Sequence, residues 1–321
     1  MTTLLVILAV SLGGLAAGYL CKVFCGHTGF ISFERLNLLS GRLKTIALLY
    51  IYPIAIINSF WKLAIADVRL LIIPAVGLLP LLLGSAVSFY LSRKYKIVPA
   101  KAASMYICGM CTNQGVMGGL ITFLVLGDQG YFYLQLVLLL ELILYYVVGF
   151  PVSYGISQGS TKLLHFRLST LKEQPQSLLP LLAVLVGVIL NTAHVRHPGL
   201  MDSISAWSIP GCALLTCLAI GMTLQWSSLR NYRTEVMLVL AAKHIVNPLV
   251  VLPAAWLLVM NGLLSPLVFQ VLIIVNFMPV GYTALLAPVL YKYDLTLANS
   301  IWLASMILCI FLFIPILMLI L

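Results

Sequence analysis

Charged residues are scarce in this sequence. Asp, Glu, Lys and Arg make up 8% of the 321 residues, and only eight of them are acidic. Soluble domains contain about 25% charged residues, because a surface that faces water needs them. With 62% apolar residues and so few charges, the chain cannot cover a soluble fold of this size. The composition therefore predicts a membrane protein.

Long polar segments are also absent. Apolar stretches of the length that a membrane-spanning helix needs, about 20 residues, fill most of the chain. We predict ten spans, at 3–21, 43–61, 70–91, 103–126, 131–154, 177–194, 204–224, 234–259, 266–290 and 297–320. No Lys or Arg precedes the first stretch and no small-x-small cleavage site is clear, so we interpret it as a retained span. The predicted fold class is an all-α polytopic membrane protein.

Basic residues are nearly absent from every second loop. The loops after even-numbered spans hold only Lys62, Arg69 and Arg196. Most of the others lie after odd-numbered spans: Lys22, Arg35, Arg42, Lys44, Arg93, Lys94, Lys96, Lys101, Lys162, Arg167, Lys172, Arg230, Arg233 and Lys292. Basic loops stay on the cytoplasmic side, so we predict a multi-pass protein of the plasma membrane (the inner membrane in a bacterium) with both termini outside. The net charge of +10 then reflects topology and does not indicate a nucleic-acid partner.

A cysteine framework and a metal motif are missing too. Most of the seven cysteines fall inside predicted spans, where we interpret them as small packing residues. Cys108-x-x-Cys111 resembles half of a metal or redox motif, but no second pair accompanies it. His194 and His197 form only a weak pair, and no His-Glu-x-x-His occurs. We therefore predict no metal site, no cofactor and no enzyme activity.

Ten spans divide into two sets of five, and an odd number per set forces the second to be inverted. We predict a first repeat at 1–155, a cytoplasmic linker at 156–175 and an inverted repeat at 176–321. A weak internal sequence similarity supports this division: Asn113-x-Gly115-x-x-Gly118 in span four corresponds to Asn276-x-x-Pro279-x-Gly281 in span nine. Paired spans that Gly or Pro interrupts, one in each half, indicate a transporter binding site.

An interrupted helix in hydrocarbon leaves N–H and C=O groups unpaired, at a cost of several kcal/mol each. Glycine permits the required dihedral angles, and Pro279 blocks helix continuation. The amides of Asn113, Gln114 and Asn276 can bond the freed groups or a ligand, and the N-termini of half-helices attract an anion. The alternative is that the glycines only allow close helix packing while the amides bond across helices.

The two interrupted segments, 106–123 and 270–288, contain no Asp, Glu, Lys, Arg or His. This absence argues against a cation/proton antiporter, which would need carboxylates there. Two ionisable residues lie deep in neighbouring spans. Glu141 is either a proton relay or a buried carboxyl that is hydrogen-bonded to a neighbouring Tyr or amide. Lys243, one turn before Asn247, either binds an anionic substrate, reaches the cytoplasmic edge of the membrane or pairs with Glu141.

Several motifs, in their order and spacing, resemble those of the auxin efflux carrier family, which includes bacterial carriers of dicarboxylates. They are Asn113-x-Gly115-x-x-Gly118, Ile220-Gly221-Met222-Thr223-Leu224, Lys243-x-x-x-Asn247-Pro248-Leu249, Pro279 and Tyr50-Ile51-Tyr52-Pro53. The resemblance implies the fold of bile-acid symporters and sodium/proton antiporters. In that fold helices 1, 2, 6 and 7 form a scaffold, helices 3–5 and 8–10 form a moving transport domain, and helices 4 and 9 break and cross at mid-membrane. It also implies a homodimer.

We therefore predict a carrier that moves a small organic anion, such as a carboxylate or an auxin-like acid, across a lipid membrane by alternating access. The predicted substrate-binding residues are Asn113, Gln114, Gly115, Gly118, Asn276, Pro279, Gly281, Lys243 and Asn247. Glu141 is the candidate for coupling to H⁺ or Na⁺. Two alternatives stay open: a sodium-coupled symporter of the bile-acid type, and a membrane receptor or channel that does not act as a carrier.

Overall fold

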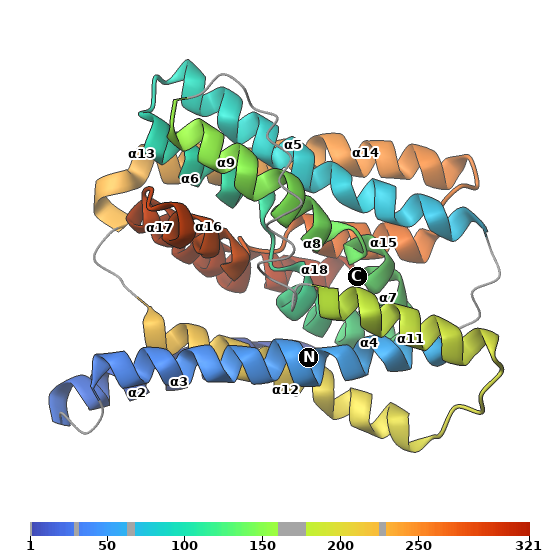
Figure 1. Ribbon diagram of the computed structural model, residues 1–321. Helices are drawn as coiled ribbons and strands as arrows, with labels where there is room; N and C mark the ends of the chain where they lie inside the picture. The colour runs from blue at the N-terminus through green and yellow to red at the C-terminus, as the bar shows by residue number, and fades with distance from the viewer. Residues whose placement is uncertain (1, 29–31, 63–67, 160–177, 225–228) are drawn as a thin grey trace. The chain divides into compact units, whose positions relative to one another are not determined.

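The computed structural model describes residues 2–28, 32–62, 68–159, 178–224 and 229–321 (Figure 1). The structure is 88% helical, and its described residues contain no β-strand. A helix pairs its backbone N–H and C=O groups within itself, so it is the form that an apolar chain can adopt where water is absent. The predicted linker at 156–175 falls largely on residues 160–177, which lie outside the described part of the chain.

Seven helices within the described residues are long and apolar enough to cross a membrane. They are Thr3–Thr28, Phe33–Lys62, Ile72–Lys94, Gln114–Ser157, Leu200–Thr223, Arg233–Met260 and Leu295–Ile320. Their lengths and compositions are those of a multi-pass membrane protein.

The seven long helices differ from the ten predicted spans in three places. Predicted spans four and five share the continuous stretch Gln114–Ser157, although Gly127 interrupts it with non-helical dihedral angles (φ 67°, ψ −163°). Span six corresponds to α11 (Leu179–Thr192), which at 14 residues is about 21 Å long. Span nine is divided into α15 (Pro266–Asn276) and a second piece, Tyr282–Tyr291.

The chain forms two compact units. Unit 1 consists of Met1–Ala66, Gly119–Phe132 and Leu178–Gln225, and unit 2 consists of Asp67–Gly118, Tyr133–Ser177 and Trp226–Leu321. In unit 1, α12 (Leu200–Thr223) packs against α2 (Gly14–Thr28), α3 (Phe33–Thr45) and α4 (Tyr52–Lys62), and α11 packs on α4. The other segments that lie wholly in unit 1 are α1 (Thr2–Leu8), η1 (Ala9–Gly13) and η2 (Ile46–Ile51).

Unit 2 is built around α6 (Pro99–Met110), whose last nine residues are all buried. It packs against α5 (Ile72–Lys94), α9 (Phe150–Ser157), α13 (Arg233–Ala241) and α17 (Leu295–Leu308). The remaining segments are η3 (Val68–Leu71), η4 (Gln114–Gly118), α8 (Glu141–Leu144), η5 (Tyr145–Gly149), η7 (Leu229–Tyr232), η8 (Ala242–Val246), α14 (Asn247–Met260), α15, η9 (Tyr282–Leu285), α16 (Leu286–Tyr291), η10 (Cys309–Phe313) and α18 (Ile314–Ile320). Helix α7 (Gly119–Leu138) begins in unit 1 and ends in unit 2.

Glycines set how closely the helices of unit 1 approach. A Cβ atom at Gly18 of α2 would collide with the carbonyl oxygen of Leu218 and lie 2.9 Å from the backbone nitrogen of Met222, both in α12. A Cβ atom at Gly221 would meet the backbone of Leu15 in the same way. Such close backbone contact is typical of helix pairs in membranes, where small residues at the interface maximise packing.

Gly18→Ala should destabilise unit 1, because the added methyl meets backbone that must move. We expect the free energy of unfolding to fall by about 1–3 kcal/mol, as in other overpacked sites. Gly26→Ala in the same helix is the control, because a Cβ atom there meets nothing within 4 Å. Unfolding in detergent measures both variants; equal stability of the two would contradict this packing.

Candidate functional site

Two helices of unit 2 are interrupted, and the interruptions meet. Helix α6 ends at Met110 and the helix resumes with η4 at Gln114, while α15 ends at Asn276 and the helix resumes with η9 at Tyr282. We call residues 111–113 and 277–281 the crossing segments. Thr112 and Val280 form an antiparallel bridge between them.

The crossing segments satisfy each other's backbone. The N–H of Asn113 donates to the carbonyl oxygen of Pro279 (2.8 Å), and the N–H of Gly281 donates to the carbonyl oxygen of Cys111 (3.1 Å). Each bond joins groups that a continuous helix would have paired internally. Because an unpaired buried amide costs several kcal/mol, this pairing makes two interruptions possible at one place.

The sequence explains why the chain breaks and crosses here. Pro279 has no N–H to continue a helix, and its carbonyl oxygen is the acceptor for Asn113. A Cβ atom at Gly281 would lie 2.8 Å from the carbonyl oxygen of Thr112, so a side chain there would push the segments apart. Gly115 and Gly118 lie in η4, and the N–H of Gly118 donates to the carbonyl oxygen of Asn113 (3.2 Å).

Buried amides without partners lie beside the crossing segments. The side chain of Gln114 is 1% exposed, and neither its oxygen nor its nitrogen has a partner among the described residues. Asn276 donates through Nδ2 to the carbonyl oxygen of Leu272 (2.8 Å), but its Oδ1 is also unpartnered there. Buried polar groups in native proteins are nearly always bonded. The unpaired amide atoms can therefore accept or donate hydrogen bonds to a ligand.

Lys243 supplies a positive charge at this place. It belongs to η8, is 2% exposed, and its Nζ donates to Thr112 Oγ1 (2.5 Å) and to the carbonyl oxygen of Cys111 (3.4 Å). The ammonium group is therefore buried against the first crossing segment and does not extend to an exposed surface. Asn247 lies apart from these contacts: its Nδ2 donates to the carbonyl oxygen of Pro80 in α5 (2.7 Å).

Glu141 is linked to Thr112 through the hydroxyl of Tyr145. The hydroxyl of Tyr145 donates to Glu141 Oε1 and accepts from the backbone N–H of Thr112 (3.0 Å). Glu141 and Lys243 form no direct ion pair in the described part of the chain, but both are linked to Thr112. Neither Thr112 nor Tyr145 was among the predicted site residues, although a neighbouring Tyr was one of the partners considered for Glu141. The available signal was the spacing of Glu141 and Tyr145, which are four residues apart and so lie on one helix face.

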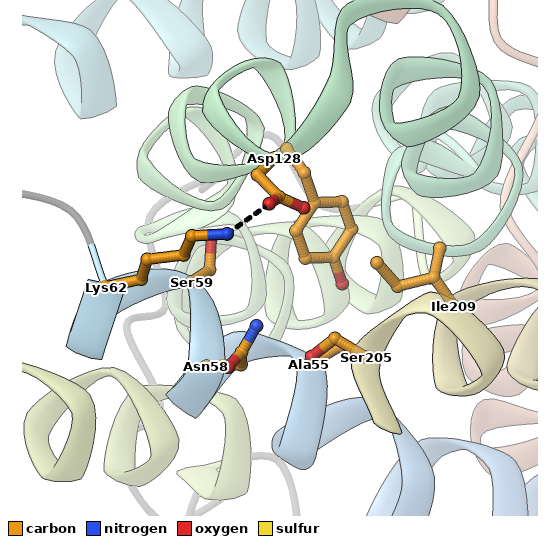
Figure 2. Close-up of a pocket in the computed structure, with 8 residues that line it drawn as sticks. Ala55, Asn58, Ser59, Lys62, Asp128, Ser205 and Ile209 are labelled. Atoms are coloured by element: carbon orange, nitrogen blue, oxygen red, sulfur yellow. Dashed lines mark hydrogen bonds and ion pairs between the residues drawn. The ribbon is translucent and has the colours of Figure 1, made fainter. Parts of the chain in front are cut away.

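A second polar cluster lies in unit 1 (Figure 2). Figure 2 shows that Lys62, at the end of α4, donates to Asp128 Oδ2 (2.7 Å). Lys62 also donates to Asp202 Oδ1 (3.0 Å). His197 Nε2 lies 2.7 Å from Asn58 Oδ1, and Asn58 lines the same small pocket as Lys62 and Asp128. These ion pairs are more than a third exposed, where such pairs contribute little stability each. The cluster therefore joins α4, α7 and α12 without forming an anion site.

Metal ligands are not grouped in the described residues: no three His, Cys, Asp or Glu side chains there lie close enough to hold an ion. The chain matches no protein-family model and no curated protein.

Tyr145→Phe should destabilise unit 2, because the Thr112 N–H and the Glu141 carboxyl would each lose a buried partner. An unsatisfied buried group costs about 1–3 kcal/mol. The matched control is Tyr146→Phe, since the Tyr146 ring packs on Phe150 and its hydroxyl forms no hydrogen bond with a described residue. Unfolding of both variants in detergent compares them, and a Tyr145 variant as stable as the control would remove the hydroxyl from this network.

Proposed function

We propose that the protein is a secondary carrier of a small organic anion, such as a carboxylate, and that the anion binds at the crossing segments of unit 2. The observation that carries the proposal is the position of Lys243. This buried ammonium group donates to Thr112, just after the end of α6, and Gln114, two residues further along the chain, is a buried amide with no partner among the described residues.

The chemistry of the site suits an anion. Lys243 provides one positive charge, and the helices that resume at Gln114 and Tyr282 begin with N–H groups that have no partner within the helix. Both N-termini carry partial positive charge, and both follow a crossing segment. The Gln114 amide and Asn113 add hydrogen-bond donors. Glu141 is the single carboxyl linked to this network in the described part of the chain, and its partner Tyr145 separates it from Lys243.

The grouping of helices supports the transporter part of the proposal. Predicted spans one, two, six and seven belong to unit 1, whereas spans three, five, eight, nine and ten belong to unit 2. Span four is divided at Gly118 and Gly119. We propose an auxin efflux carrier-like fold with ten helices in two inverted repeats. Its scaffold domain (helices 1, 2, 6 and 7) would correspond to unit 1, and its transport domain (helices 3–5 and 8–10) would correspond to unit 2 except for part of helix 4. Alternating access would proceed by movement of unit 2, which holds the site, against unit 1.

A sodium-coupled symporter is the second candidate, because unpartnered amide oxygens are suitable sodium ligands. Gln114 Oε1 and Asn276 Oδ1 are two such atoms close to the crossing segments. In either case we propose a homodimer in the plasma membrane with both termini outside, as the basic loops and the family resemblance imply. A channel or receptor would differ in function, since neither couples net flux of the anion to a second ion.

Lys243→Gln should weaken anion binding while keeping a hydrogen-bonding group at Thr112. A loss of tenfold or more in affinity is expected, because tenfold corresponds to about 1.4 kcal/mol and a buried charge is removed. Calorimetry with mono- and dicarboxylates measures it. The control is Lys44→Gln, a buried lysine of unit 1. Unchanged affinity in the Lys243 variant would leave this residue with a structural role only.

Glu141→Gln tests which ion is coupled. If Glu141 carries a coupled proton, the variant should lose accumulation driven by a pH gradient and keep anion exchange in proteoliposomes, because a neutral amide no longer titrates. The same vesicles are assayed with a sodium gradient. Accumulation that follows sodium and is unaffected by Glu141→Gln would favour the symporter and reject proton coupling through this residue.

A further inference from the structure

A pocket lies where α5, α6 and α9 end or begin in unit 2. Its cavity volume is about 80 Å³, and it opens to the surface. Phe89 and Arg93 of α5, Ile97 of the following turn, Pro99 and Ala102 of α6, and Ile156 of α9 line it. Helix α6 packs against both α5 and α9 (Figure 1). The walls are apolar except for one charged side chain, the guanidinium group of Arg93.

No residue in the described ranges neutralises the charge of Arg93. Its guanidinium group lies over the ring of Phe89, 5.5 Å from the ring centre, and it forms no ion pair with any described residue. Lys94 and Lys96 are exposed beside it. Lys101 differs, because its Nζ donates to Glu235 Oε1 (2.8 Å), and this hydrogen bond raises the pKa of Lys101. Arg93 is therefore the available cation of this pocket.

The N-terminus of α6 adds to the positive potential on the pocket wall. Pro99 and Ala102 line the pocket, so it borders the first turn of this helix. The residue before the helix, Val98, provides no side-chain cap, and the first N–H that pairs within the chain there is that of Ala102. The N–H groups of Ala100 and Lys101 thus have no partner within the helix. Uncapped N–H groups and an arginine together fit a phosphate.

The helix end beside the pocket carries the residues that are typical of the lipid headgroup region. Helix α5 is apolar along most of its 23 residues and ends with Arg93 and Lys94. Tyr90 and Tyr95, on either side of this end, are 63% and 52% exposed. Exposed tyrosines next to basic residues mark the boundary of the hydrocarbon region. The positive-inside rule predicts that this end faces the cytoplasm, where anionic lipids are concentrated.

We propose that this pocket binds an anionic phospholipid, with the headgroup phosphate on Arg93 and the N-terminus of α6, and with part of an acyl chain against Ile97, Ala102 and Ile156. The charge of Arg93 favours an anion, and the apolar walls favour a hydrocarbon chain. A free phosphate would match only the first of these two features. The site is separate from the crossing segments, and the proposal does not depend on transport.

The test uses the full-length protein in a neutral detergent. Thermal unfolding is followed with added short-chain phosphatidylglycerol, with phosphatidylcholine of the same chain length, and with inorganic phosphate. We expect phosphatidylglycerol to raise the melting temperature and the other two to have little effect. In Arg93→Gln the half-saturating phosphatidylglycerol concentration should rise by fivefold or more. Lys94→Gln removes the same charge one residue away without touching the pocket lining, and should change it by less than twofold.

Three results would overturn the proposal. Equal effects of phosphatidylglycerol and phosphatidylcholine would show that the headgroup charge is not recognised. A phosphate effect equal to that of the lipid would show a site for a soluble anion only. Equal responses of the Arg93 and Lys94 variants would place lipid binding elsewhere or make it a diffuse effect of charge. Because Arg93 is exposed, its variant should fold, and its melting temperature without lipid checks this directly.

Discussion

The structure of unit 2 depends on one constraint, which is that no backbone amide can stay unpaired in an apolar interior. The chain leaves the helix at residues 111–113 and again at 277–281. Each break would be costly alone. Together they offset most of this cost, because each break supplies partners for the other. The N–H of Asn113 donates to the carbonyl oxygen of Pro279, and the N–H of Gly281 donates to the carbonyl oxygen of Cys111. The two breaks therefore have to lie at one depth and in contact.

This pairing also determines where the ionisable groups meet. Thr112 uses its backbone N–H for Tyr145 and its Oγ1 for Lys243, so the first crossing segment lies between the two. Tyr145 in turn donates to Glu141. A change in the charge of Glu141 or in the partner of Lys243 would thus alter the hydrogen bonds of Thr112. The neighbours of Thr112, Cys111 and Asn113, form the backbone bonds between the crossing segments. This connection offers a physical route by which an ion and an anion could affect each other's binding.

The sequence predicted these features unevenly, for physical reasons. The apolar composition and the Gly and Pro residues of segments 106–123 and 270–288 were sufficient to locate the breaks, because hydrocarbon length and missing N–H groups act locally. The lengths of the helices next to Gly127 could not be predicted as well, because one glycine can bend a helix without ending it. The sequence could not show which partner Lys243 has. Its three alternatives, an anionic substrate, the membrane edge or Glu141, differ only in the direction of the side chain. The bond of Asn247 to Pro80 joins residues 167 positions apart, and local spacing carries no information on it.

The two crossing segments are chemically unequal, and this bears on how a ligand would be recognised. The first is followed by Gln114 and contains Thr112 and Asn113, whereas the second contains Phe277, Met278, Pro279 and Val280 between Asn276 and Gly281. Pro279 and Gly281 contribute backbone geometry, while the polar side chains come mainly from the first. The charge comes from neither, because Lys243 belongs to η8 and reaches across to Thr112. In the proposed inverted-repeat fold, polar groups of the first repeat and the cation of the second would then have to act together. The proposed binding site would therefore need residues of both proposed repeats.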